Sequence, residues 1–357
     1  MKVGILGSPQ SGKTTLFQAL TRGKVPVQPM GSTRPNVGVV SVPDERVDYF
    51  AAQYKPKKVT YAPIEFTDVA PRPGSQKEFD AAFFADVRKS DAIVAVIRGF
   101  VNEYGEEPSP AGDTAALTDE LLLADLTLIE TRLERIDKSL HGAKKGAAGS
   151  PQQEKEFLKR LQKSLEEGVK LGALEFTEEE KKALAAYDFL TMRQVIAVLN
   201  VDEEELASPT RITEDFKRCC SEGNIPCLVL CAAAEKEIAA LSDEDEKLFL
   251  EDMGIREPAR NALIKKTYEA LGLISFITAG EPEVKAWTVR KGSTALEAAA
   301  AIHTDIAKGF IRAEVANFND ILPVETWENA KAQGIVRLYG KEYIVQDGDV
   351  LYIRCKA

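Results

Sequence analysis

The residues best suited to chemistry lie within the first fifteen positions of the chain. Gly7, Gly12, Lys13 and Thr14 form the pattern G-x-x-x-x-G-K-T, directly after a short apolar run that ends at Leu6. Glycines let backbone N–H groups approach phosphate oxygens closely, and the first turn of a following helix presents further N–H groups to an anion. The lysine supplies a mobile positive charge, and the threonine hydroxyl completes a Mg²⁺ shell. The spacing therefore predicts a nucleoside triphosphate site in a strand, loop and helix.

The whole loop is the predicted phosphate-binding segment, and a carboxylate further along the chain is expected to join it. Asp68 ends an apolar strand predicted over 62–69, where a Walker-B carboxylate holds Mg²⁺. Thr33, in preference to Ser32, is the candidate from the loop that usually reaches the γ-phosphate. The predicted metal-site residues are thus Thr14, Thr33 and Asp68. The predicted phosphate-binding residues are Gly7, Ser8, Pro9, Gln10, Ser11, Gly12, Lys13, Thr14 and Thr15.

The residues after Asp68 depart from the usual pattern of nucleotide switches. Such proteins continue Asp-x-x-Gly, and the glycine N–H contacts the γ-phosphate. Position 71 is proline here, which has no N–H to donate, so the contact is absent or has moved to Gly74. Efficient hydrolysis is therefore in question. No catalytic residue is assigned, because the chain's two histidines have no companions that suggest a dyad.

A second strand, predicted over 193–200, ends in a segment that would meet the base. GTPases carry Asn-Lys-x-Asp at this place, where the last carboxylate accepts hydrogen bonds from guanine. This chain has Asn200 and Val201, with Glu203 in the position of the aspartate. A longer side chain does not reproduce a matched polar pair, so guanine specificity is not supported. The remaining predicted base contacts are from the backbone of Ala232 and Ala233, after the strand over 226–231.

Length and composition describe an ordinary globular protein. The chain has 357 residues, a formal net charge of −10 and five cysteines without metal-binding spacing. The acidic balance disfavours indiscriminate binding of nucleic acid by the whole surface. The first residues already form a core strand, so no signal peptide is expected, and no run is long enough to span a membrane. We expect a cytoplasmic protein that binds neither DNA nor membranes.

The order of apolar runs predicts the fold class. Strands alternate with helices in the first hundred residues, as in a doubly wound α/β sheet. Long helices with apolar residues at helical spacing follow, as expected for an inserted antiparallel helical hairpin. After Gly280 the chain predicts a small β-grasp-like domain, in which strands over 341–345 and 350–354 form a terminal pair. The predicted domains are 1–117 with 193–280, 118–192 and 281–357.

These residues resemble a known family, the YchF/Obg-like ATPases. The resemblance rests on the run from Arg34 to Val40, on the Asn-x-x-Glu segment from Asn200 to Glu203, and on a C-terminal part that looks like the family's TGS domain, with Asp347-Gly348-Asp349 near its end. It covers nearly the whole chain. It implies a P-loop domain and slow Mg²⁺-dependent hydrolysis of ATP in preference to GTP. It also implies association with ribosomes or translation factors, and RNA is a further candidate partner. Two departures, Pro71-Arg72 and Gln10 in the loop, place turnover in question.

Two other functions fit the sequence. One is a GTPase. The other is a binding module that holds nucleotide with negligible turnover, while the helical insertion and the C-terminal domain bind a partner. Pro71 and Arg72 motivate the second alternative.

Overall fold

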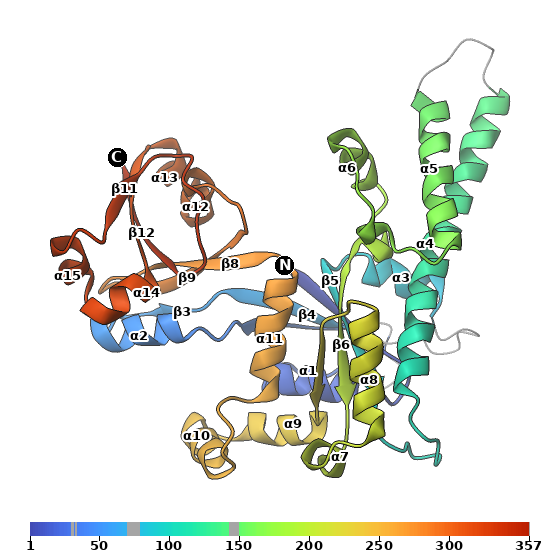
Figure 1. Ribbon diagram of the computed structural model, residues 1–357, viewed down its shortest axis with the longest axis horizontal. Helices are drawn as coiled ribbons and strands as arrows, with labels where there is room; N and C mark the ends of the chain where they lie inside the picture. Colours follow the sequence, from blue (N-terminus) through green and yellow to red (C-terminus); the bar gives the residue numbers. More distant parts are fainter. Residues whose placement is uncertain (30–31, 33, 70–78, 143–149, 357) are drawn as a thin grey trace. The chain divides into compact units, whose positions relative to one another are not determined.

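The computed structural model describes residues 1–29, 32, 34–69, 79–142 and 150–356 (Figure 1). By its internal contacts the chain divides into two compact units, of which unit 1 comprises 1–38 and 65–259 and unit 2 comprises 39–64 and 260–357. These units are not the three domains expected from the sequence, whose boundaries stay a prediction. No helix of the described residues is long and apolar enough to cross a membrane.

Unit 1 is built around a six-stranded sheet with the strand order β2-β4-β1-β5-β6-β7. The pairs β4–β1, β1–β5, β5–β6 and β6–β7 are all parallel. The strands are β1 Lys2–Leu6, β2 Asn36–Ser41, β4 Pro63–Asp68, β5 Ala92–Arg98, β6 Gln194–Asn200 and β7 Cys227–Leu230. Because crossover connections place the carboxyl ends of parallel strands at one edge, the ends of β1, β4, β6 and β7 are brought together there.

Two groups of helices pack on this sheet. Helix α1 packs with α9 and β1, whereas α4 packs with β5 and α8. The helices of unit 1 are α1 Lys13–Leu20, α3 Ala81–Val87, α4 Pro110–Gly142, α5 Ser150–Glu166, α6 Glu178–Leu184, α7 Glu203–Ala207, α8 Arg211–Glu222, α9 Ala232–Ala240 and α10 Asp243–Asp252, with 3₁₀ turns at Leu171–Ala173 and Leu190–Met192. The central strand β5 is apolar and buried over 92–97, as a strand covered on both faces must be. The predicted doubly wound α/β sheet is confirmed.

Helices α4 and α5 form the predicted helical hairpin. Their shared core contains Ile129 and Leu158, both fully buried, together with apolar residues of the segments that follow α5. Arg132 of α4 donates from Nε to Oε1 of Glu154 on α5 over 2.7 Å. Thr177 forms a capping box at the start of α6. The helical spacing of the apolar residues thus predicts the hairpin that the structure contains.

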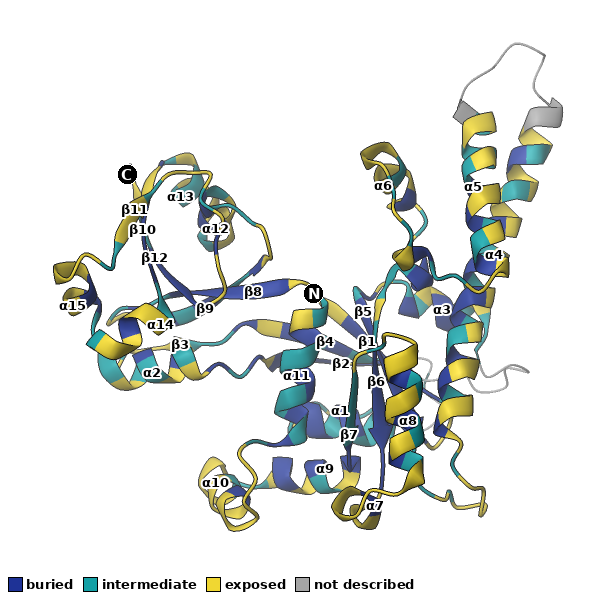
Figure 2. Cartoon of the chain, viewed as in Figure 1, coloured by how far each residue is buried: buried dark blue, intermediate teal, exposed yellow. Residues whose placement is uncertain are grey.

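Unit 2 contains a second six-stranded sheet in the order β11-β10-β12-β8-β9-β3. Helix α12 packs on it and contributes three buried alanines to a core with Phe276, Val315 and Leu351 (Figure 2). Its strands are β3 Val59–Thr60, β8 Leu273–Thr278, β9 Val284–Arg290, β10 Phe310–Asn317, β11 Arg337–Tyr339 and β12 Asp349–Cys355. Its helices are α2 Glu45–Tyr54, α11 Ala259–Ala270, α12 Ala295–Ile302, α13 Thr304–Lys308, α14 Phe318–Ile321 and α15 Trp327–Ala332, with a 3₁₀ turn at Leu322–Val324.

The predicted terminal strand pair in this unit is wrong. Residues 341–345 form no strand and make a single bridge, from Ile344 to Thr294. The last strand, β12, instead pairs with β10 and β8. The expected hairpin loop is an anchored turn, in which Asp349 accepts hydrogen bonds from Gln346 N over 2.9 Å and from the Tyr343 hydroxyl over 2.7 Å.

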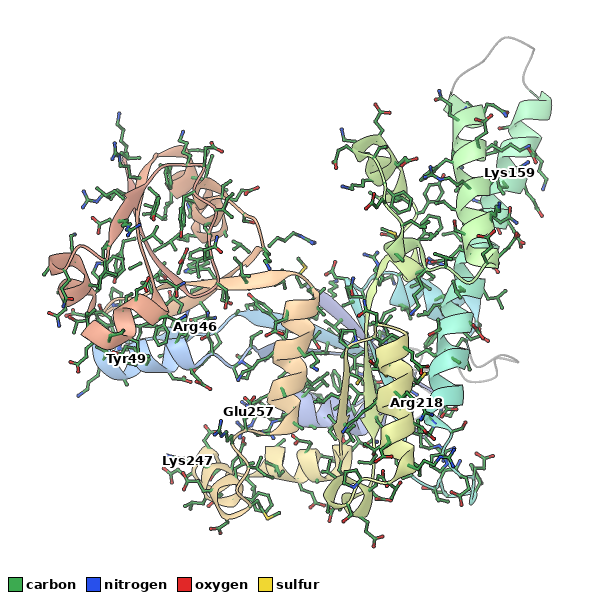
Figure 3. All side chains as sticks on the ribbon, viewed as in Figure 1. Arg46, Tyr49, Lys159, Arg218, Lys247 and Glu257 are labelled. Carbon is green, nitrogen blue, oxygen red and sulfur yellow. The ribbon has the colours of Figure 1, made fainter. Side chains whose placement is uncertain are left out.

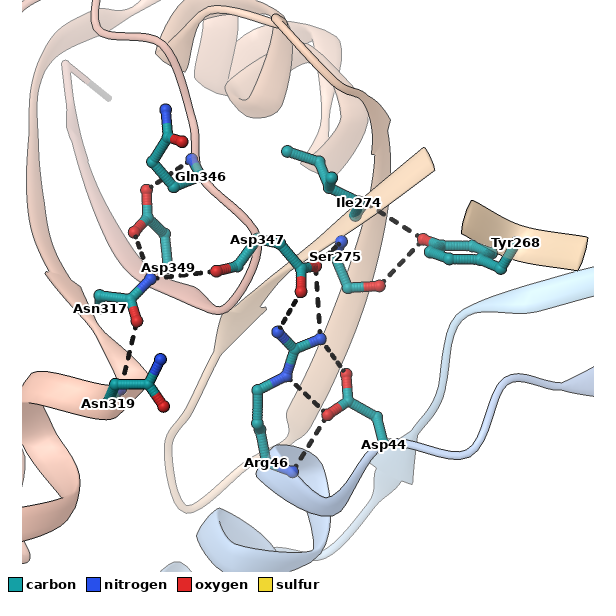
Figure 4. A network of polar contacts seen from close by, with 10 residues as sticks. All are labelled: Asp44, Arg46, Tyr268, Ile274, Ser275, Asn317, Asn319, Gln346, Asp347 and Asp349. Carbon is teal, nitrogen blue, oxygen red and sulfur yellow. Dashed lines mark hydrogen bonds and ion pairs between the residues drawn. The ribbon is translucent and has the colours of Figure 1, made fainter. Parts of the chain in front are cut away.

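The neighbouring aspartate of this turn fixes it to two other parts of unit 2 (Figure 4). Asp347 accepts from Ser275 N of β8 over 2.8 Å and from Arg46 of α2 over 2.7 Å. Arg46 also pairs with Asp44, which caps α2, over 2.8 Å. The pKa of Arg46 is raised, since its hydrogen bonds to both aspartates outweigh burial, the largest single effect, which lowers it. Charged side chains, rather than a second hairpin strand, therefore hold the segment before β12.

Candidate functional site

The phosphate-binding loop connects β1 to α1, and two of its glycines have conformations that only glycine adopts readily. Gly7 has φ +153°, and an added Cβ would lie 2.2 Å from the carbonyl oxygen of Val96. Gly12 has φ +91°, and an added Cβ would lie 2.1 Å from the amide nitrogen of Asn200. A side chain at either position would displace the neighbouring strand ends. The pattern therefore has its glycines where the packing requires them.

Lys13, the first residue of α1, is buried and lies across this loop. Its ammonium group donates to the carbonyl oxygens of Gly7 over 2.6 Å and Ser8 over 2.7 Å. These bonds compensate the desolvation of a buried charge. They hold one positive charge at the loop where phosphate oxygens are expected.

Thr14 and Asp68 lie side by side, as the prediction of a shared metal site requires. The Thr14 hydroxyl donates to Oδ2 of Asp68 over 2.8 Å, and Asn36 donates to the same oxygen over 2.9 Å. The other carboxylate oxygen, Oδ1, is buried and has no hydrogen-bond partner within the described part of the chain. A buried carboxylate oxygen without a partner is costly unless a cation compensates it. The donor set of one hydroxyl and one carboxylate fits Mg²⁺, which keeps several waters and phosphate oxygens in its shell.

Three features that the sequence predicts to act with this pair lie outside the described residues. They are the metal-site candidate Thr33, the departure at Pro71 and Arg72, and Gly74. Their proposed roles stay predictions. Ser32 is described, and its hydroxyl accepts from Arg34 N over 3.1 Å.

The predicted base-binding residues converge at the ends of β6 and β7. Asn200 is buried and bridges two loops, since its amide donates to Ser11 O over 2.9 Å and its side-chain oxygen accepts from Ala232 N over 2.8 Å. It therefore positions the phosphate-binding loop against the start of α9. Ala232 N–H is used in this bond and is not available to a base. Val201 is buried and its N–H donates to Leu230 O.

The acidic residues after Val201 differ in their roles. Asp202 caps α7 by accepting from Glu205 N over 2.8 Å. Glu203, the first residue of α7, is exposed, as is Ala233. Glu205 is buried and accepts from the Thr213 hydroxyl over 2.6 Å. Burial, the largest effect, would raise the pKa of Glu205, but its hydrogen bonds together keep the pKa lowered. Glu205 is thus structural, whereas the side chain of Glu203 is exposed at the predicted base site.

A cavity of about 1060 Å³ adjoins the loop and follows α3 and α4. Gly7, Ser8, Phe84, Asp113 and Leu117 are among its lining residues. Burial raises the pKa of Asp113, an effect that the nearby charge of Arg98 opposes. Among the described residues, no group of three or more His, Cys, Asp and Glu side chains is placed to hold a metal ion.

Asn36 is a site residue that the sequence did not assign. Its side chain joins two segments, accepting from Gln28 N over 2.7 Å while donating to Asp68. In the sequence, the only indication of a role for Asn36 is its place in the run from Arg34 to Val40. No neighbouring residue shows that β2 brings Asn36 to the end of β4.

Comparison with known proteins gives matches over almost the entire chain. It is 38% identical over 365 residues to the ribosome-binding ATPase YchF of Bacillus subtilis, covering 99% of both proteins, and 37% identical over 362 residues to that of Haemophilus influenzae, covering 99% and 98%. This chain belongs to the YchF family. The solved YchF GTPase of Schizosaccharomyces pombe has a TM-score of 0.86 at 28% identity, over 99% of this chain and 97% of that one.

Two family models match separate parts of this YchF family member. Residues 2–122 match a model described as a 50S ribosome-binding GTPase. Residues 273–356 match the YchF-GTPase_C model, which is described as a protein of unknown function. The resemblance inferred from the sequence is confirmed, and with it the P-loop domain.

Proposed function

We propose that this protein is a slow, Mg²⁺-dependent ATPase of the cytoplasm that associates with the ribosome. The layout predicted from the sequence is part of the proposal: a nucleotide-binding domain over 1–117 and 193–280, a helical insertion over 118–192 and a TGS-like domain over 281–357. The ATPase activity and the ribosome partner are suggested by the bacterial relatives, which are named ribosome-binding ATPases. The details of the site come from its own geometry.

The observation that carries the proposal is the pair of Thr14 and Asp68 beside the loop. The hydroxyl and carboxylate are in contact, and Asp68 keeps one buried oxygen without a protein partner among the described residues. In the nucleotide complex Thr14 and Asp68 would hold Mg²⁺, which neutralises charge on the β- and γ-phosphates. Lys13 and the N–H groups at the start of α1 would bind the same phosphates. The predicted nucleotide-binding set of residues 7–15 is retained in full.

The preference for adenine rests on the segment from Asn200 to Glu203. A guanine site needs a carboxylate at a fixed reach for two N–H donors, and replacing aspartate by the longer Glu203 changes that reach. Asn200 positions the loop, and Val201 is buried in a core cluster with Phe216. Of the two predicted contact residues after β7, Ala232 is buried and Ala233 is exposed. We therefore propose ATP over GTP.

Calorimetric titration with Mg·ATP and with Mg·GTP tests this preference. We expect tighter binding of ATP, and a Glu203→Asp variant that narrows the difference because its carboxylate has the length found in GTPases. Lys13→Ala is the control that loses both nucleotides. A wild-type preference for GTP would overturn the base assignment while leaving the phosphate site intact.

Co-sedimentation of the full-length protein with ribosomes tests the partner. We expect the protein to sediment with the ribosomes. If the nucleotide acts as a switch, the fraction of protein in the pellet should differ between samples with ATP and samples with ADP. Lys13→Ala should remove that difference. Absence from the pellet with either nucleotide would contradict the ribosome association but not nucleotide binding.

A further inference from the structure

Helix α10 carries apolar side chains on its exposed surface. Sixteen large hydrophobic residues are exposed within the described ranges, and four of them fall within positions 248–255. They are Leu248, Phe249, Met253 and Ile255, with exposed fractions of 62%, 42%, 61% and 42%. Single exposed hydrophobic residues are common on globular proteins, whereas a group on one short segment indicates an interaction surface. These four residues are called the α10 patch below.

The helix is secured at its start rather than by a buried face. Leu250 is its only buried residue, at 8% exposure. The Ser242 hydroxyl caps the helix by accepting from Asp245 N over 3.1 Å. Arg22, which follows α1, forms ion pairs with Asp243 over 2.8 Å and with Glu246 over 3.0 Å. These contacts fix α10 to the body of unit 1 and leave its apolar side chains uncovered.

The end of the helix is also fixed, and this holds the patch in one shape. Gly254 has φ +65° and donates to Glu251 O over 3.1 Å, while Ile255 N donates to Leu250 O over 2.9 Å. This is the left-handed stop that terminates many helices. Ile255 is therefore bonded back to the last turn, next to Met253. The backbone that carries the four side chains is thus held in one conformation, which lowers the entropic cost of binding.

The helix that carries most of the patch is rich in carboxylates. Positions 243–252 contain six aspartates and glutamates and one lysine, Lys247, whose ammonium lies 3.9 Å from Glu251 (Figure 3). Nearly the whole helix is exposed, as Figure 2 shows. Such a surface repels the phosphates of RNA and of anionic membranes. It also repels a second copy of itself, since a self-complementary contact would bring the same carboxylates together.

We propose that the α10 patch is a docking surface for a basic amphipathic segment of a partner protein. The apolar side chains of that segment cover Leu248, Phe249, Met253 and Ile255, and its lysines and arginines face the surrounding carboxylates. Charge complementarity selects this partner class, because the apolar contacts supply affinity while the charges supply specificity and rate of association. The surface is separate from the nucleotide site, and it is independent of the proposed activity.

A fluorescent peptide of leucine and lysine, with leucines at helical spacing, is the probe, and its anisotropy is titrated with the full-length protein. In the double variant Leu248→Ser/Met253→Ser we expect at least a tenfold rise in Kd, because each substitution removes apolar area that the probe buries. The double variant Glu251→Lys/Asp252→Lys should also weaken binding, and more so at low salt. Urea unfolding of each variant verifies that it is folded.

Matched controls separate docking from general attraction to an acidic protein. Tyr104→Ser removes a side chain that is 78% exposed elsewhere in unit 1. Glu166→Lys/Glu167→Lys makes the same change in charge at the end of α5. Both controls should bind the probe with a Kd within about twofold of wild type. Equal weakening by the α5 charge variant, or an unchanged Kd in both α10 variants, would overturn the proposal. So would a wild-type dimer in sedimentation that the Leu248→Ser/Met253→Ser variant dissociates.

Discussion

Asn200 couples the phosphate-binding loop to the β7–α9 turn, so Asn200→Ala should weaken both stability and nucleotide binding. The side chain is 5% exposed and makes two hydrogen bonds, to Ser11 O over 2.9 Å and from Ala232 N over 2.8 Å. Truncation leaves a buried carbonyl and a buried N–H without partners, at about 1–3 kcal/mol each. We expect a loss of about 3 kcal/mol, in the lower half of that combined range, because the exposed Gln10 beside Ser11 gives water a route to the freed groups.

Urea unfolding and ATP titration together measure this effect. Out of a typical stability of about 5–15 kcal/mol, a loss of 3 kcal/mol shifts the unfolding midpoint clearly. We also expect at least a tenfold weaker Kd for ATP, since Ser11 and Gly12 are no longer held. Asn200→Asp keeps the acceptor for Ala232 but loses the donor to Ser11, so it should bind ATP as poorly. Asn102→Ala, which removes bonds in an exposed loop, is the control. A variant Asn200→Ala with wild-type unfolding and wild-type ATP affinity would refute this reasoning.

Three further predictions concern other parts of the molecule. Gly12→Ala should abolish ATP binding in calorimetry, because its Cβ would lie 2.1 Å from Asn200 and its φ is +91°; a wild-type Kd would contradict the assigned loop conformation. The hydrogen bond from Arg132 lowers the pKa of Glu154 below its ordinary 4.5, so this bond stabilises the folded protein above that pH and the gain is lost as pH falls through the lowered pKa. Glu154→Gln should therefore be less stable than wild type in urea at pH 7 by up to about 1 kcal/mol, the difference should shrink as pH falls through the lowered pKa, and a difference that does not change with pH would argue against it. Arg46→Ala should cost about 3 kcal/mol in urea unfolding because it leaves one buried and one exposed aspartate without their cation, and a loss below about 0.5 kcal/mol would show that the network is not structural.

The phosphate site was predictable because its signals are local. The segment from Gly7 to Thr15 joins a strand directly to a helix. The glycines at positions 7 and 12 themselves indicate that these positions need small residues. Asp68 was found from its place at the end of an apolar strand. That Thr14 and Asp68 are in contact follows from the parallel pairing of β1 and β4, which the doubly wound pattern implies.

Contacts between distant segments could not be read in the same way. The bond from Asn36 to Asp68 depends on β2 lying beside β4, and no residue near position 36 indicates that neighbour. The hydrogen bond from Asn200 to Ser11 was not predicted either. An asparagine that bonds to Ser11 and one that bonds to a base look alike in sequence.

In the C-terminal part, contacts between distant segments likewise decide which residues form strands. A strand was predicted over 341–345, but Asp349 and Tyr343 bond to each other and hold the segment as an anchored turn. Strand β8 follows α11 after Leu271 and Gly272, whose φ is +65°, and it lies before Gly280, where the sequence predicts the domain boundary. Strand β11 has only three residues, too few for a pattern.

The claim that Thr14 and Asp68 form the Mg²⁺ site of a nucleotide-binding protein is tested most directly by calorimetry of ATP with Mg²⁺ and with a chelator. The wild-type protein should bind ATP at least tenfold more tightly with Mg²⁺. Asp68→Asn preserves the shape of the side chain and removes its charge, so it should lose this dependence while binding ATP in chelator within about twofold of wild type. An Asp68→Asn protein that keeps the full dependence on Mg²⁺ would contradict the account.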